Sequence, residues 1–70
     1  MKYRETARKL KSLGCQEIER RSGGSHHKWL NPLTGRAATI PDWGSADLKV
    51  GTLHAAIRQL GLDWKDFEQA

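Results

Sequence analysis

The sequence is poor in cysteine and in long apolar runs, and each scarcity excludes a class of protein. Its 70 residues include a single cysteine, Cys15, so the chain cannot form an internal disulfide or a cysteine-based zinc cluster. No apolar run approaches the roughly 20 residues that span a bilayer. The start of the chain also leads into charged residues rather than a signal-peptide core. We therefore expect a soluble, cytoplasmic protein whose fold depends on side-chain packing.

Length and apolar content limit the chain to one small core. Hydrophobic residues make up 37% of the sequence, which is enough for one core and too little for two. We expect residues 1–70 to form a single domain. A core of this size supplies only about 3–5 kcal/mol of stability. Binding to another copy or to a partner protein would add to it.

Basic residues are concentrated in the first half of the chain. Residues 1–36 hold nine lysine and arginine residues against three glutamates, a balance of +6, whereas residues 37–70 carry −2. A basic half on a small protein is typical of a polyanion ligand such as nucleic acid. The same charge also fits a solvated surface or an acidic protein partner.

Apolar residues recur at helical spacing in two parts of the chain. The first set predicts a helix that ends at Leu13, followed by Gly14 as a left-handed C-cap. The second set predicts a helix over residues 50–60, with Thr52 as a candidate N-cap. Asp63 is placed to cap a last helical turn, whose aromatic side chains would fold back on the core.

Turn residues and prolines divide the middle of the chain into three short strands. Residues 15–21 alternate weakly, residues 26–30 end before Pro32, and residues 36–40 end before Pro41. The predicted fold class is α+β, with a three-stranded antiparallel sheet in an α-β-β-β-α order. Helices would cover one face of the sheet and leave the other open.

The sequence GGSHHKW, residues 23–29, gathers groups that can act on a phosphodiester. If Trp29 packs under the helices, strand alternation places His27 on the same side and leaves His26 and Lys28 on the open face. Histidine titrates near neutral pH and can exchange a proton with a ribose 2′-hydroxyl or a departing 5′-oxygen. A pair of histidines is also common as an ordinary surface pair, so this spacing alone leaves both interpretations open.

Polar groups near the histidine pair are candidates for binding the phosphate. Lys28, Arg20 or Arg21 would balance the charge on it, while Ser25 and the amides around Gly24 would hold its oxygens. The histidines are not expected to bind a metal, because adjacent strand residues diverge and no cysteine completes a ligand set.

Two isolated residues keep simpler interpretations. Trp43 either stacks on a base or anchors a loop. Cys15 is expected to be a small core residue.

Several short motifs, unremarkable singly, occur in a specific order along nearly the whole chain. They are Leu10 to Gly14 in the form LxxLG, Gly24-Ser25-His26-His27, Asn31-Pro32 with Gly35-Arg36, Thr39-Ile40-Pro41, and Lys49-x-Gly51-Thr52-Leu53 running to Leu62. In this order the sequence resembles the HicA toxins, the RNA-cleaving components of HicAB toxin–antitoxin systems.

The resemblance implies a fold similar to double-stranded RNA-binding domains and ribosome-independent cleavage of mRNA without a metal or other cofactor. It implies that the histidine of the Gly-Ser-His motif, His26, is catalytic, with His27 as the alternative. The residues expected to bind RNA are then Lys28, Ser25, Gly24, Arg20, Arg21 and Arg36.

The resemblance also implies a HicB antitoxin partner that covers the active face and represses the operon through a DNA-binding part. The alternatives to a type II toxin endoribonuclease are a non-catalytic double-stranded RNA-binding module and a protein-interaction domain with an acidic partner.

Overall fold

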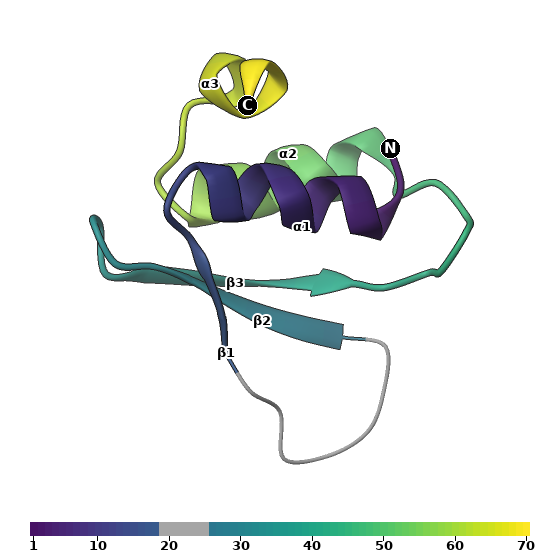
Figure 1. Cartoon of the computed structure of the whole chain (residues 1–70), viewed down its shortest axis with the longest axis horizontal. Coiled ribbons are helices and arrows are strands. Elements are labelled where there is room, and N and C mark those ends of the chain that lie inside the picture. Colours follow the sequence, from purple (N-terminus) through teal and green to yellow (C-terminus); the bar gives the residue numbers. More distant parts are fainter. Residues whose placement is uncertain (19–25) are drawn as a thin grey trace.

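The computed structural model describes residues 1–18 and 26–70, and these form three helices and three strands (Figure 1). In chain order they are α1 (Tyr3–Ser12), β1 (Gln16–Ile18), β2 (His26–Asn31), β3 (Arg36–Pro41), α2 (Val50–Gln59) and α3 (Trp64–Gln69). The sheet has the order β1-β2-β3, and both strand pairs are antiparallel. α1 and α2 lie on the same side of the sheet, and no described element covers its other face. The predicted α+β fold is confirmed.

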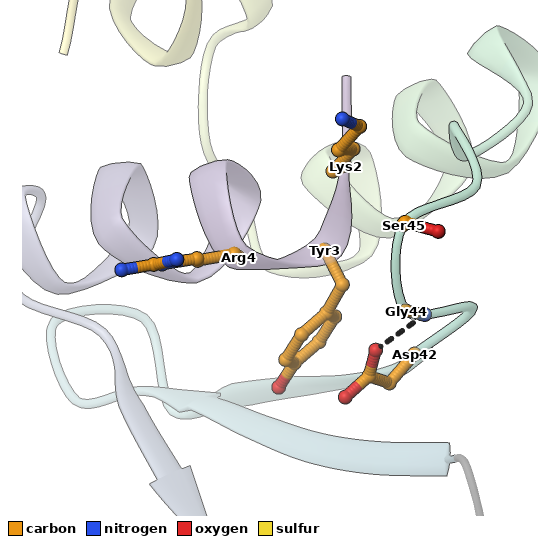
Figure 2. Close-up of a pocket in the computed structure, with 6 residues that line it drawn as sticks. All are labelled: Lys2, Tyr3, Arg4, Asp42, Gly44 and Ser45. Carbon is orange, nitrogen blue, oxygen red and sulfur yellow. Dashed lines mark hydrogen bonds between the residues drawn. The ribbon is translucent and has the colours of Figure 1, made fainter.

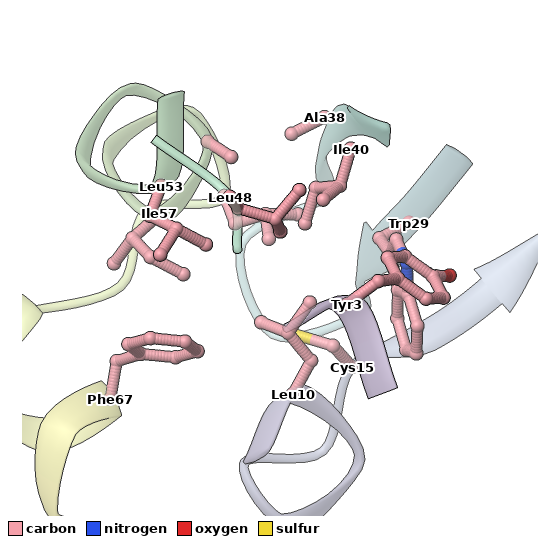
Figure 3. Close-up of a cluster of buried hydrophobic side chains, with 12 residues drawn as sticks. Tyr3, Leu10, Cys15, Trp29, Ala38, Ile40, Leu48, Leu53, Ile57 and Phe67 are labelled. Carbon is pink, nitrogen blue, oxygen red and sulfur yellow. The ribbon is translucent and has the colours of Figure 1, made fainter. Parts of the chain in front are cut away.

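The core lies between the sheet and the helices, and Trp29 is its largest fully buried side chain (Figure 3). Along β2, Trp29 and Asn31 are buried while His26 and Lys28 are exposed, as strand alternation requires. The indole Nε1 of Trp29 donates a hydrogen bond to the Tyr3 hydroxyl at 3.1 Å. Burying such side chains contributes about 1.5–3 kcal/mol each, so β2 is held firmly beneath α1.

Glycine ends the two longer helices in the same way. Gly14 has a φ of +90°, and the amide of the following Cys15 donates to the Leu10 carbonyl at 2.9 Å. Gly61 has a φ of +73°, and the amide of Leu62 donates to the Ile57 carbonyl at 3.1 Å. Both bonds belong to the Schellman motif, which favours glycine because of the left-handed backbone. The predicted helix ends are confirmed.

Two details of the predicted elements need correction, the N-cap of α2 and the ends of β2 and β3. Thr52 is not an N-cap, because α2 already begins at Val50, and Lys49 precedes it without a side-chain capping bond. β2 and β3 each extend one residue further than predicted, to Asn31 and Pro41. Proline is tolerated there because β3 is an edge strand. Of the strand predicted over residues 15–21, the structure describes Gln16–Ile18, and residues 19–21 lie outside the described residues.

α3 packs on the helices rather than on the sheet. Asp63 caps it as predicted, since its Oδ1 accepts a hydrogen bond from the Lys65 amide at 2.8 Å. Phe67 is fully buried in the core. At the other end of α3, the Nζ of the buried Lys9 donates to the Glu68 carbonyl at 2.7 Å and makes longer bonds to neighbouring carbonyls. The positive charge of a lysine interacts favourably with the negative end of the helix dipole, which lies at this end of α3.

In the part of the chain that the structure describes, no helix combines the length and the apolar character needed to cross a membrane.

Candidate active site

His26 and Lys28 lie on the open face of the sheet, and both are exposed. His26 is the first residue of β2 and is paired with Pro41 at the end of β3. Lys28 is two residues further along and is paired with Thr39 on one side and Ile18 on the other. The structure therefore brings an imidazole and an ammonium group together on one surface, as the alternation predicts.

His27 faces the helices and is engaged on both sides of its ring. Its Nδ1 lies 2.6 Å from Oε2 of Glu17, and its Nε2 lies 3.4 Å from Oδ2 of Asp42. The ring also lies against Tyr3, with 4.6 Å between the ring centroids. Only 14% of the His27 side chain is exposed. His27 thus links β2 to β1, to α1 and to the segment after β3.

The sequence analysis did not single out Glu17 and Asp42 as partners of His27. Glu17 is paired with Trp29, which places it diagonally across from His27 on the same face of the sheet. Asp42 directly follows Pro41, the partner of His26. If the antiparallel register were known, both carboxylates would be expected near His27. The sequence indicates where the strands begin and end but not which residues are paired.

Tyr3 is a buried aromatic residue that contacts both Trp29 and His27. Burial raises the pKa of Tyr3 to about 12; the hydrogen bond from Trp29 opposes this shift, and the nearby Glu17 and Asp42 carboxylates reinforce it. The hydroxyl is therefore protonated at neutral pH. Tyr3 positions Trp29 and His27 and cannot act as a general base there.

A pocket of about 410 Å³ opens between the start of α1 and the segment that follows β3 (Figure 2). It is lined by Lys2, Tyr3, Arg4, Asp42, Gly44 and Ser45. The Asp42 Oδ1 accepts a hydrogen bond from the Gly44 amide at 2.9 Å. The sequence signal for this turn is the Asp-x-Gly spacing.

Of the other residues predicted to bind RNA, the structure describes Arg36, which does not lie beside His26. Arg36 begins β3 and is paired with Asn31, so it lies five strand positions from the partner of His26. This is about 16 Å along the strand, so the structure does not bring Arg36 to the histidine. Ser25, Gly24, Arg20 and Arg21 lie outside the described residues.

The structure places Cys15 in the core and Trp43 at the surface. Cys15 is buried as predicted, and burial raises the pKa of its thiol, which makes it an unreactive core residue. Trp43 is 41% exposed, so part of its ring is accessible to a base. Within residues 1–18 and 26–70, no cluster of three or more histidine, cysteine or carboxylate side chains could hold a metal ion.

Comparison with known proteins identifies the family. The model of the HicA toxin of bacterial toxin–antitoxin systems matches residues 3–62, which comprise α1, the whole sheet and α2. The chain belongs to the HicA toxin family. HicA toxins are ribonucleases that act as mRNA interferases, and the chain is a toxin of this kind. A search of curated proteins found no match, and neither did a search of solved structures.

The HicA match includes the described residues around the two histidines. His26, Lys28 and the carboxylates around His27 all fall inside residues 3–62. α3 lies beyond the matched segment, although Phe67 on α3 completes the core. The HicA family also implies a HicB antitoxin and an RNA substrate.

Proposed function

We propose that this HicA toxin cleaves mRNA with His26 as the catalytic general acid or base. The observation that supports this proposal is the contrast between the two adjacent histidines. His26 is exposed on the open face, whereas both ring nitrogens of His27 face carboxylates and only 14% of that side chain is exposed. A catalytic histidine must come within hydrogen-bond reach of the substrate, and the position of His26 allows this.

The chemistry we propose is an attack by the ribose 2′-hydroxyl on the adjacent phosphate. His26 takes the proton from the 2′-oxygen, or gives one to the departing 5′-oxygen. Lys28, exposed on the same face, stabilises the charge that develops on the phosphate oxygens. We propose that Ser25, Gly24, Arg20 and Arg21 contribute to phosphate binding. Arg36 would contact the RNA further along the strand.

We further propose that the whole chain, residues 1–70, is one HicA domain that acts in the cytoplasm. Its open sheet face would be covered by a HicB-type antitoxin in a heteromeric complex. The formal charge of +4 supports an acidic inhibitor through charge complementarity.

The first test is cleavage of a long single-stranded RNA in excess EDTA by the parent chain and by His26→Ala. We expect the parent to cut the RNA and the variant to lose about 10²–10⁴-fold in rate, the usual contribution of a general acid or base. Circular dichroism and thermal unfolding confirm that the variant is folded. Full activity of a folded His26→Ala would contradict the assignment.

Two matched histidine variants show whether the loss of RNA cleavage is specific to His26. His54→Ala removes a histidine from α2, where its ring is stacked on Trp64 at 3.6 Å between centroids, and should cleave normally. His27→Ala tests the alternative histidine. If only this variant lost RNA cleavage, the catalytic role would belong to His27, which Glu17 would then orient.

Tight RNA binding with intact RNA in every sample would instead favour the double-stranded RNA-binding module. Absence of RNA affinity at low salt would favour a protein-interaction domain.

The 2′-hydroxyl mechanism has a separate test. An RNA with one deoxyribose at the mapped cleavage position should resist cleavage there and still be cut elsewhere. Cutting at the deoxyribose position would exclude the proposed attack while leaving the role of His26 to the variant comparison.

A further inference from the structure

The pocket between α1 and the segment after β3 has fixed walls. The Leu48 amide donates to the Met1 carbonyl at 2.8 Å, and Lys2 forms an antiparallel bridge with Asp47. These contacts hold the start of α1 against Asp47 and Leu48. On the opposite wall, the Ala46 amide donates to the Trp43 carbonyl at 3.1 Å and closes a turn. The pocket is therefore formed by backbone contacts before any ligand binds.

The inner part of the pocket suits a planar group with hydrogen-bond donors. Figure 2 shows the Tyr3 ring reaching from α1 toward the sheet, with the Asp42 carboxylate nearby. Asp42 already accepts from the Gly44 amide and lies 3.4 Å from His27. A carboxylate has about four lone-pair positions, so it can still accept from an amino group. The same negative charge disfavours a phosphate at this position.

Two positively charged residues, Lys2 and Arg4, also line the pocket and are exposed. Figure 2 shows their side chains extending in different directions from the start of α1, so each can bind a different phosphate of a strand. Trp43 is next to Asp42 in the sequence and outside the pocket lining, and its exposed indole can stack on a neighbouring base. The two cations, the Tyr3 ring and the Asp42 carboxylate of the lining together match the parts of a nucleotide.

Size and position agree with this chemistry. The volume of about 410 Å³ is at the small end of the roughly 300–1,000 Å³ of small-molecule sites, so it suits a single nucleotide better than a duplex. Asp42 follows Pro41, which is paired with His26. The pocket thus lies at the same end of the sheet as the candidate catalytic histidine.

We infer that this pocket binds one nucleotide of the RNA strand near the cleaved bond, with its base inside and the flanking phosphates at Lys2 and Arg4. The inference rests on the proposed function, because it assigns a subsite to the same RNA substrate. It predicts that the toxin prefers an unpaired nucleotide beside the cleavage position.

The test measures binding of a short fluorescein-labelled single-stranded RNA to the full chain carrying His26→Gln, with gels confirming that the RNA stays intact. Lys2→Gln and Arg4→Gln should each weaken binding severalfold and reduce the slope of log K against log salt by about 0.7. Trp43→Ala should weaken binding by about tenfold, the scale of losing one stacked base. Arg58→Gln and Lys65→Gln, exposed cations on α2 and α3, are the matched controls and should bind like the parent.

The outcomes separate the subsite from the function. Pocket variants that fold and bind RNA like the two controls would overturn the subsite, while RNA cleavage by the unmodified parent would keep the proposed function. Lack of cleavage by the parent would instead count against the proposed function. NMR titration with adenosine monophosphate should shift the amides of Gly44 and Ser45 more than inorganic phosphate does. Equal shifts would show that only the phosphate is bound and would overturn the base-binding part.

Discussion

At the scale of single residues, Gly61 and Gly14 share a left-handed backbone but have different surroundings. A Cβ on Gly61 would lie 2.9 Å from Cγ2 of Thr34, whereas nothing lies within 4 Å of one on Gly14. Both Gly14→Ala and Gly61→Ala should cost about 1–2 kcal/mol for the backbone conformation. Gly61→Ala should cost more, because Thr34 also bonds the Leu60 carbonyl. Urea unfolding measures the difference, and equal losses would contradict the predicted clash.

Tyr3 should make the stability of the fold sensitive to alkaline pH. Its pKa is about 12 in the folded chain against 10.0 for an ordinary tyrosine. The unfolded chain therefore loses this proton first, so the contribution of Tyr3 is complete below pH 10 and is lost as pH rises to about 12. Tyr3→Phe should show a shallower loss across this range. At pH 7 it should be about 1–3 kcal/mol less stable, because the buried Trp29 Nε1 loses its acceptor.

Thermal unfolding of both proteins at several pH values isolates this effect, because every other ionisable group is the same in the two proteins. Parallel pH profiles would show that Tyr3 does not carry the predicted dependence.

At the scale of elements, α3 is held mainly by its two ends. Asp63→Ala should destabilise the chain by about 1 kcal/mol because it removes the N-cap, while Asp63→Asn should retain most of the stability, since asparagine also caps. Lys9→Met should release the carbonyl end of α3. Amide hydrogen exchange should then be faster in α3 than in α2. Uniform exchange in both helices would mean that α3 does not open separately.

Most element boundaries could be predicted because they depend on local chemistry. Glycines with positive φ end α1 and α2, and Asp63 caps α3 through its own side chain. The buried bond from Lys9 to Glu68 could not be predicted, because it joins residues 59 positions apart. The prediction of Thr52 as the N-cap was wrong because α2 begins at Val50, without a side-chain capping bond.

In the candidate site, too, the features that depend on local chemistry could be predicted and those that depend on distant residues could not. Strand alternation correctly separated His26 and Lys28 from His27, because the period of a strand is local. The carboxylates of Glu17 and Asp42 were missed, because their approach to His27 depends on strand register and on the path after β3. The pocket beside them depends on contacts between both halves of the chain.

At the scale of the whole molecule, α1 and α2 lie on one side of the sheet, and no described element covers its other face. If RNA and a HicB-type antitoxin share this face, the antitoxin should block cleavage in proportion to complex formed. His26→Ala should still co-purify with the antitoxin, because truncating one exposed side chain leaves the rest of the face intact. Complex formation should weaken at high salt, since it includes charge complementarity. A complex that still cleaves RNA at the full rate would contradict the shared face.

The contacts of α3 also affect how the toxin is made. α1 is synthesised before α3, yet Lys9 and the core around Leu10 are completed by Phe67 and Glu68 of α3. While residues 64–70 remain inside the ribosome, the nascent chain exposes the apolar face of α1. Such a surface is prone to aggregation and attracts chaperones. The core of the toxin is therefore complete only after α3 has left the ribosome.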